Sequence, residues 1–174
     1  MNQKNDARRR HTGEPEAAKT VFPESFEYET YRKDQILIRI PQNPGFFFDE
    51  NGCWAYRSGA KARIGVTDLV LQSLYEIIYF NPPQAGTEII QFGEIGVIES
   101  GKAVFTVASP VTGKVTAVNE ALVAAPELIN QNPYEKGWIA EVELADFEKD
   151  RKALLDITGY LPVLQRKLAE LGMK

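Results

Sequence analysis

The chain has 174 residues, 44% of them hydrophobic, and a formal net charge of −4 at pH 7. This length and composition suffice for one hydrophobic core, and the negative charge excludes nucleic acid and anionic membranes as principal partners, since both need clustered cations. The single cysteine, Cys53, and the single histidine, His11, exclude an internal disulfide and a Cys/His metal cluster. No stretch approaches the roughly 20 apolar residues of a membrane span. We therefore expect a reduced, cytoplasmic protein.

The first 50 residues divide into two segments. Residues 1–20 are polar and lack periodicity, which predicts a disordered tail. Residues 21–50 contain one β-like run, at 36–40, and are predicted to form a docked extension with one strand. The extension ends in the aromatic run Phe46–Phe48. Two interpretations of this run stay open: the aromatics cover an edge of the domain, or they form an exposed patch that docks a partner.

From residue 51 the pattern changes to short apolar runs separated by Gly, Pro and Asn. A short helix is predicted at 67–74, where the Thr67 hydroxyl can cap the first turn. Strands are predicted at 54–57, 62–66, 76–80, 88–90, 95–99, 103–108, 114–118 and 138–144. Short strands at this spacing predict an all-β barrel or sandwich rather than a βαβ sheet.

The rest of the chain is predicted to be mainly loop and helix. Residues 119–136 contain prolines and asparagines, which indicate a loop with at most one helical turn. Two helices are predicted at its end, one over 146–157 that stops at Thr158 and Gly159, and one over 161–171 with Pro162 in its first turn. Their apolar residues recur at intervals of three and four, which indicates core packing rather than cofactor binding.

Lys102 stands between two of the predicted strands, at the tip of a tight hairpin. Gly96, Gly101 and Lys102 match the spacing of a phosphate-binding loop, but Ala103 occupies the position where Ser or Thr must hold the metal ion. A helix should also begin there, whereas residues 104–107 alternate like a strand. Nucleotide binding is therefore not favoured.

Two interpretations of Lys102 remain from the residues alone. Most turn lysines are simply solvated. A lysine held by two rigid strands is also how a carrier presents a covalently attached arm, because the arm must reach out while its anchor stays fixed.

The run from Ile64 to Leu144 resembles the glycine cleavage system H protein family. The resemblance rests on segments that keep one register, among them Gly65-Val66-Thr67-Asp68, the strand-like run 74–86, Ile98-Glu99-Ser100-Gly101-Lys102-Ala103, Ser109-Pro110-Val111-Thr112-Gly113, Val118-Asn119-Glu120-Ala121-Leu122, Pro126-Glu127-Leu128-Ile129-Asn130 and Asn132-Pro133-Tyr134 through Gly137-Trp138. The Ile98–Ala103 segment carries the lysine and is similar to the family's Val-Glu-Ser-Val-Lys-Ala, in which the lysine is lipoylated. A biotin site would show Met-Lys-Met, which is absent.

The resemblance implies a mostly β, flattened barrel-sandwich hybrid of the lipoyl-domain type over residues 51–174, with a short internal helix and C-terminal helices. It implies lipoate on Lys102, with Glu99, Gly101 and Gly113 supporting the attachment site. A lipoate ligase or lipoyl transferase would load the arm. Glycine decarboxylase, aminomethyltransferase and dihydrolipoamide dehydrogenase would act on it, so the chain would be a carrier and not an enzyme.

The sequence departs from the family at three places. Gly52-Cys53-Trp54 replaces His-Glu-Trp, Gly101 replaces Val, and Val104-Phe105-Thr106 replaces Ala-Ser-Asp. Two alternatives therefore stay open: a lipoyl carrier of another pathway, such as heterodisulfide-reductase-like sulfur oxidation, and a non-lipoylated scaffold. Cys53 is either a buried free cysteine or a thiol that relays electrons near the arm.

Overall fold

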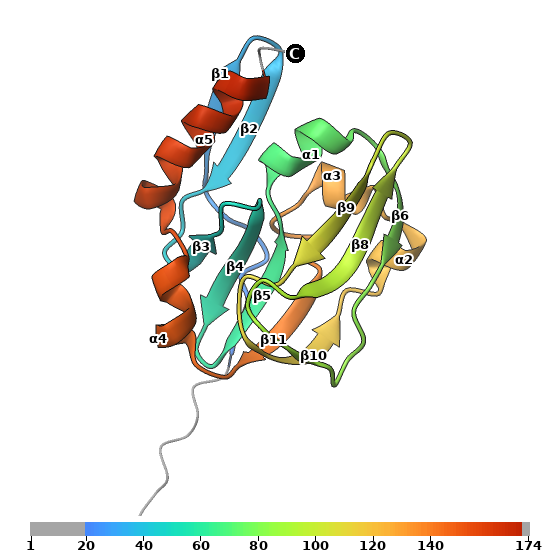
Figure 1. The fold of residues 1–174 in the computed structure, drawn as a ribbon, viewed down its shortest axis with the longest axis vertical. Helices are drawn as coiled ribbons and strands as arrows, with labels where there is room; N and C mark the ends of the chain where they lie inside the picture. The colour runs from blue at the N-terminus through green and yellow to red at the C-terminus, as the bar shows by residue number, and fades with distance from the viewer. Residues whose placement is uncertain (1–19, 172–174) are drawn as a thin grey trace, which may run out of the picture.

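The computed structural model describes residues 20–171, so nearly all of the predicted tail lies outside the described residues. Three antiparallel sheets form the body of the molecule (Figure 1). The largest has the order β3 (Phe46–Phe48), β4 (Cys53–Ser58), β5 (Lys61–Val66), β11 (Ala140–Leu144), β10 (Gly113–Val118) and β7 (Glu88–Ile89). The second has the order β6 (Ile77–Asn81), β8 (Glu94–Ser100) and β9 (Val104–Ala108), and the third pairs β1 (Tyr28–Lys33) with β2 (Ile36–Pro41).

The main core lies between the six-stranded and the three-stranded sheet. Ile98 of β8 and Val107 of β9 are buried in the same cluster as Ile64, Val115 and Val142 of the larger sheet. Successive side chains of a strand point to opposite faces, so the inward positions are apolar and their neighbours reach the surface. The barrel-sandwich prediction is confirmed, and each predicted strand of the domain is present within a few residues of its expected bounds.

The short helices α1 (Asp68–Leu74), α2 (Ala121–Ala124) and α3 (Leu128–Gln131) connect strands. The short helix α4 (Phe147–Asp150), the 3₁₀ turn Arg151–Ala153 and the long α5 (Ile157–Leu171) follow the last strand, β11. Thr67 precedes α1 as expected, but its buried hydroxyl makes no capping hydrogen bond. No helix in the part of the chain that the structure describes is long and apolar enough to cross a membrane.

The predicted boundary between the two C-terminal helices is wrong. The helical run is interrupted before Thr158, where Leu155 exchanges two backbone hydrogen bonds with Phe48 of β3 (2.7 and 2.8 Å). The Asp156 carboxylate then accepts a hydrogen bond from the N–H of Gly159 (2.8 Å) and starts α5. Thr158 and Gly159 therefore lie inside α5, and Pro162 falls in its second turn rather than its first.

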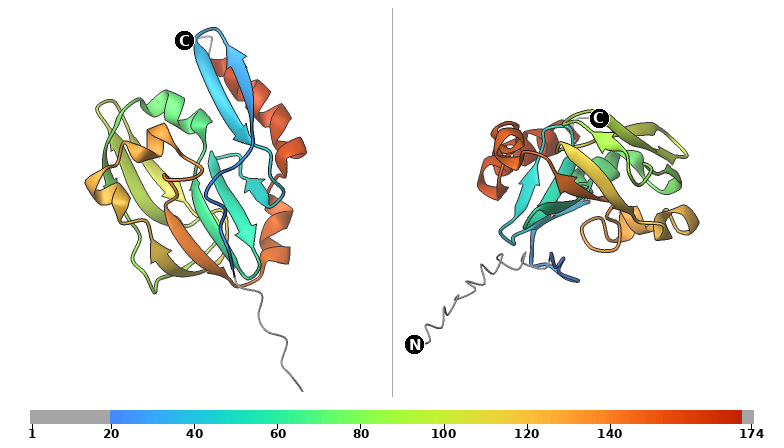
Figure 2. Two further views of the ribbon diagram at one scale, coloured as in Figure 1. Left: turned by 180° about the vertical axis from the view of Figure 1, so that it is seen from behind. Right: turned by 90° about the horizontal axis from the view of Figure 1, so that it is seen from below.

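The segment 21–50 holds three strands rather than the one predicted. β1 was missed because it contains no aliphatic residue and none of its side chains is fully buried. It exists because it pairs with β2 along its whole length, from Tyr28 opposite Pro41 to Lys33 opposite Ile36. The β1–β2 ribbon lies along α5 and extends beyond the sheets (Figures 1 and 2).

The extension and α5 share a second hydrophobic core. Its buried members are Ile38, Ile40, Phe46, Phe48, Trp54, Leu69, Tyr134, Tyr160, Val163, Leu164 and Leu168. Phe48 stacks on Tyr160 with ring centroids 4.5 Å apart, and Phe47 packs edge-on against Phe147 at 4.9 Å. The aromatic run of β3 thus covers the edge of the domain, and its interpretation as an exposed docking patch is wrong.

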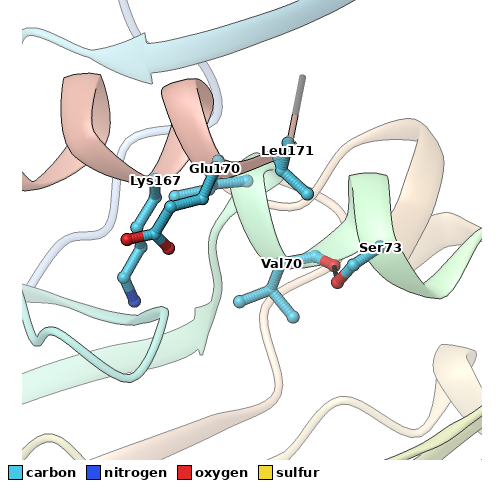
Figure 3. Close-up of a pocket in the computed structure, with 6 residues that line it drawn as sticks. Val70, Ser73, Lys167, Glu170 and Leu171 are labelled. Atoms are coloured by element: carbon cyan, nitrogen blue, oxygen red, sulfur yellow. Dashed lines mark hydrogen bonds between the residues drawn. The ribbon is translucent and has the colours of Figure 1, made fainter. Parts of the chain in front are cut away.

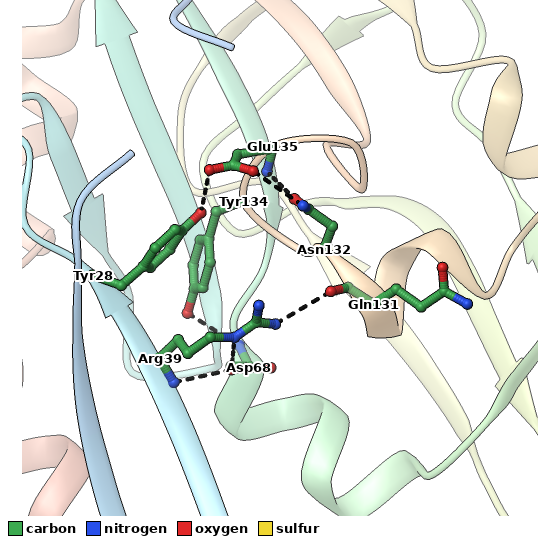
Figure 4. A network of polar contacts seen from close by, with 7 residues as sticks. All are labelled: Tyr28, Arg39, Asp68, Gln131, Asn132, Tyr134 and Glu135. Carbon is green, nitrogen blue, oxygen red and sulfur yellow. Dashed lines mark hydrogen bonds and ion pairs between the residues drawn. The ribbon is translucent and has the colours of Figure 1, made fainter. Parts of the chain in front are cut away.

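A polar network fastens the extension to the loop after α3 (Figure 4). The Glu135 carboxylate accepts hydrogen bonds from the Tyr28 hydroxyl and the Phe26 N–H, both at 2.9 Å, and from the Asn132 amide at 3.0 Å. Partial burial alone would raise the pKa of Glu135, but these hydrogen bonds outweigh burial and lower it. The extension is therefore held by charge-assisted hydrogen bonds as well as by apolar packing.

Candidate functional site

The turn between β8 and β9 comprises residues 101–103 and is closed by Ser100, the last residue of β8. The Ser100 N–H donates to the carbonyl of Ala103 (2.9 Å), and its hydroxyl oxygen accepts from the N–H groups of Lys102 (3.2 Å) and Ala103 (3.1 Å). The flanking strands are paired up to Glu99 and Val104. Two strands and one side chain thus fix the backbone that carries Lys102.

Lys102 itself is exposed at the tip of this hairpin. Its ammonium nitrogen lies 4.1 Å from the ring centroid of Tyr75, the residue that ends α1. Among the described residues, no carboxylate lies within ion-pair distance of Lys102, although Glu76 and Glu99 flank the site. The amine is therefore accessible and contacts an aromatic face rather than an acid.

Two hollows adjoin Lys102. One, of about 290 Å³, lies between the hairpin tip and the segment Tyr75–Ile78. The other, of about 700 Å³, is bounded by Tyr75, by Gln35 and Ile36 of the β1–β2 ribbon, and by Leu171 at the end of α5. The predicted extension therefore contributes walls to the surroundings of the lysine, which no local sequence pattern indicated.

A third hollow, of about 510 Å³, lies between α1 and α5 and shares the lining residues Ser73 and Leu171 with the hollow of about 700 Å³ (Figure 3). Val70 and Ser73 of α1 face Lys167, Glu170 and Leu171 of α5. Lys167 reaches past this hollow and donates a hydrogen bond to the carbonyl of Glu50. Residues near the end of α5 thus line the hollow beside α1, and Leu171 also lines the hollow beside Lys102.

The structure brings two of the three predicted supporting residues to Lys102. Glu99 lies on the outer face of β8, directly between Tyr79 of β6 and Val104 of β9. Gly101 occupies the turn itself, with an ordinary φ and no atom within 4 Å of the position that a Cβ would take. Glycine is therefore not required there, and the valine typical of the family would fit.

Gly113 is not close to the hairpin tip. β9 carries the chain away from the turn, and Gly113 begins β10 after the connection that follows β9. A Cβ at this position would lie 2.0 Å from the carbonyl oxygen of Glu143 in β11. Gly113 is needed because two backbones approach closely, and it does not form part of the Lys102 turn.

Cys53 lies on β4 and is completely buried. Burial, with a further contribution from the Asp49 carboxylate, raises the pKa of its thiol well above the usual value. The thiolate is the reactive form of cysteine, and here it is disfavoured. The structure supports a packing role for Cys53 rather than a thiol relay.

Comparisons with known proteins place the chain in a family. The family model "Glycine cleavage H-protein" matches residues 46–167. The chain belongs to the glycine cleavage H-protein family. The matched segment begins at β3 and ends within α5, so the β1–β2 ribbon lies outside it.

Curated relatives carry the same name. A glycine cleavage system H protein of Micrococcus luteus is 39% identical over 126 residues, which cover 71% of this chain and 96% of the relative. One from Anaeromyxobacter sp. strain K is 41% identical over 107 residues, which cover 62% of this chain and 83% of the relative. One from Listeria monocytogenes is 42% identical over 117 residues, which cover 67% of this chain and 93% of the relative. H proteins are lipoyl carriers of the glycine cleavage system.

A solved structure shows the same fold. The crystal structure of a glycine cleavage system H protein from Mycobacterium marinum superposes with a TM-score of 0.59 at 23% sequence identity. The superposition covers 97% of that chain and 69% of this one. This H-family chain therefore has segments with no counterpart in that structure.

Tyr75 is the residue at the site that sequence reasoning missed. Its backbone adopts φ 61° and ψ −145°, a region that non-glycine residues rarely enter. Its position directly after a short helix is one where a residue with positive φ often ends the helix, but a tyrosine there does not predict such a conformation. Its approach to Lys102, 27 positions along the chain, follows from the tertiary packing of α1 beside the hairpin.

Proposed function

We propose that Lys102 carries lipoate in amide linkage and that this chain serves as an aminomethyl carrier of the glycine cleavage system. The observation that carries the proposal is the exposed amine of Lys102 at the tip of a hairpin whose sequence is similar to the family's attachment motif. Curated relatives named glycine cleavage system H protein support the same pathway.

The surroundings of Lys102 fit a long acyl arm. The Lys102 amine has no ion pair among the described residues, so amide formation breaks none there. Ser100 and the paired strands fix the anchor while the side chain stays outside the core. Lipoate, when attached, supplies a disulfide that one enzyme reduces and another reoxidises. The chain supplies attachment, orientation and a recognisable surface.

The apolar surface around the hairpin tip supports recognition by enzymes. Four of the large hydrophobic residues with more than half of their surface exposed lie near Lys102: Tyr75, Ile78, Tyr79 and Val104. Exposed apolar clusters beside a functional group typically mark an interface. A lipoate ligase or lipoyl transferase would first dock here, and then glycine decarboxylase, aminomethyltransferase and dihydrolipoamide dehydrogenase in turn.

The attachment is tested by mass spectrometry of the intact protein after coexpression with a lipoate ligase and supply of lipoate. We expect one lipoyl group per chain, located on Lys102 by peptide mapping, and none on Lys102→Arg, which keeps the positive charge. Lys114→Arg, which changes an exposed lysine of β10, is the matched control and should be lipoylated fully. Lipoylation that survives Lys102→Arg would refute the site.

The pathway is tested separately with the lipoylated protein. Reconstitution with the three glycine cleavage enzymes should give glycine-dependent reduction of NAD, and unlipoylated protein should give none. A lipoylated protein that fails in this assay with active enzymes would instead belong to another pathway, such as heterodisulfide-reductase-like sulfur oxidation. A protein that no ligase modifies would be a scaffold.

A further inference from the structure

Tyr75 combines a strained backbone with an exposed aromatic ring. A tyrosine at φ 61° pays a steric cost that glycine avoids. The surrounding structure holds it there. The Tyr75 N–H donates to the carbonyl of Leu71 (3.1 Å), its carbonyl accepts from the Asn130 amide (2.6 Å), and the carbonyl oxygen of that amide accepts from the N–H of Ile77 (2.8 Å).

With its backbone held by these hydrogen bonds, Tyr75 directs its ring toward Lys102. Tyr75 is 60% exposed as a residue, so burial of apolar surface does not explain the position of its ring. The Lys102 ammonium lies 4.1 Å from the ring centroid, within the range of a cation–π interaction. Tyr75 also forms a wall of both hollows beside Lys102.

The contact depends on the charge of the lysine. A cation is attracted to the negative face of an aromatic ring, whereas an amide nitrogen carries no such charge. Acylation of Lys102 begins from the free amine, which attacks the carbonyl carbon of an activated acyl donor such as an acyl adenylate. The C–N bond forms, the leaving group departs with its bonding electron pair, and the proton on nitrogen passes to a base. The product is neutral and no longer attracted to Tyr75.

We propose that Tyr75 is a positioning residue that holds the unmodified Lys102 ammonium against its ring and releases the side chain once the lysine is acylated. The inference rests on the proposed attachment of lipoate to Lys102, but its test does not require a lipoylating enzyme. The held state competes with acylation, so loss of the ring accelerates modification. Exposed cation–π interactions have strengths that correspond to an acceleration of about two- to fivefold.

The test compares Tyr75→Leu, which removes the ring, with Tyr75→Phe, which keeps it, and with the unchanged protein. Unmodified full-length proteins are treated with limiting N-hydroxysuccinimidyl acetate, and acetylation of Lys102 is followed by peptide-resolved mass spectrometry. Acetylation of Lys114 in the same samples serves as an internal reference. We expect Tyr75→Phe to react like the unchanged protein at Lys102 and Tyr75→Leu to react about two to five times faster.

Nuclear magnetic resonance gives a second readout of the contact. The Cε protons of Lys102 should be shifted upfield by the ring current in the unchanged protein and in Tyr75→Phe. This shift should be absent in Tyr75→Leu and after acetylation. Equal Lys102 reactivity in all three proteins, slower reaction of Tyr75→Leu, or a ring-current shift that persists after acetylation would each overturn the inference.

A parallel series with a lipoate ligase, lipoate and ATP separates this inference from the proposed function. Absence of lipoylation in every protein, including the unchanged one, would refute the attachment proposal while the acetylation series still decides the role of Tyr75. Lipoylation of all three at one rate would leave the attachment proposal standing. It would overturn the role of Tyr75 in acylation.

Discussion

The Asp68 carboxylate at the start of α1 binds Arg39 of β2 through one oxygen, which accepts from the Arg39 backbone N–H at 2.9 Å and from its Nε at 3.1 Å. Asp68 is buried and Arg39 is one-third exposed. The same guanidinium reaches the carbonyl of Gln131 (3.4 Å), and the Asp68 N–H donates to the buried Tyr134 hydroxyl (3.1 Å). One ion pair thus joins the extension, α1 and the loop after α3 (Figure 4).

Arg39→Ala is expected to lower the free energy of unfolding by about 1–3 kcal/mol, because it leaves the Asp68 carboxylate with a single donor in a buried place. Urea denaturation measures this loss, and hydrogen exchange should show faster opening of β1 and β2 than of β8. Arg32→Ala, which removes an exposed arginine of β1, is the control and should change stability little. Equal effects of the two variants would show that the ion pair does not fasten the extension.

Glu135 makes the docking of the extension sensitive to acid. Its pKa is lower in the folded protein than in the unfolded chain, so the stabilisation is present above the unfolded value and is lost as the pH falls through the folded value. Glu135→Gln should cost about 1 kcal/mol at pH 7, since the site is partly open to solvent, and progressively less below pH 4. Urea unfolding across this pH range measures the difference, with the exposed Glu143→Gln as the control. A loss of stability in Glu135→Gln that is the same at every pH would contradict a stabilising role for the Glu135 charge.

Asp49 shows the opposite dependence. Burial raises the pKa of its carboxyl, although the N–H groups of Asn51 and Cys53 donate to Oδ1 and oppose the shift. A carboxyl whose folded pKa is raised favours folding at low pH and loses that contribution as the pH rises through the folded value. Asp49→Asn keeps an oxygen for both donors and removes the charge, so it should stabilise the protein at pH 8 more than at pH 4.

The control for Asp49 is Asp34→Asn, which changes an exposed residue in the β1–β2 turn. Asparagine tolerates the left-handed conformation that Asp34 adopts there, so the stability of this variant should differ little from that of the unchanged protein at either pH. Thermal unfolding at both pH values compares the two variants. A stabilisation by Asp49→Asn that does not grow with pH would show that folding does not raise the pKa of this carboxyl.

We expect substitution by alanine to affect the free energy of unfolding differently at Gly101 and at Gly113. Gly101→Ala places its Cβ in open space and should alter the free energy of unfolding by less than about 0.5 kcal/mol. Gly113→Ala places its Cβ 2.0 Å from the Glu143 carbonyl oxygen and forces β10 and β11 apart, at a cost of about 1–3 kcal/mol. Urea denaturation of both variants decides this, and comparable losses would refute the distinction. Lipoylation of Gly101→Ala should proceed normally.

Much of the domain could be predicted from the sequence, because its signals are local. The β8–β9 hairpin follows from two alternating runs around Ser100 and Gly101, and that alternation also excluded the helix that a phosphate loop needs. The second C-terminal helix was misplaced because Thr158 and Gly159 look like a stop. The actual break depends on Leu155 pairing with Phe48, more than 100 positions earlier.

The structure of the N-terminal extension also depends on contacts between distant segments. Residues 28–33 are too polar to predict a buried strand, and only pairing with β2 and packing against α5 make β1 stable. The Glu135 contact with Phe26 spans 109 positions, and no pattern within either segment indicates it.

The sequence by itself determined the antiparallel β domain, its family and a lysine at the tip of a hairpin, since each depends on side-chain alternation, turn residues or a contiguous motif. The tertiary structure alone decided what surrounds that lysine. Tyr75 contacts Lys102 while a hydrogen bond from Asn130 holds the backbone of Tyr75 in a conformation that tyrosine disfavours. Gly113 allows the close approach of β10 and β11. These relationships join distant segments, and their energies depend on the packed fold rather than on local propensity.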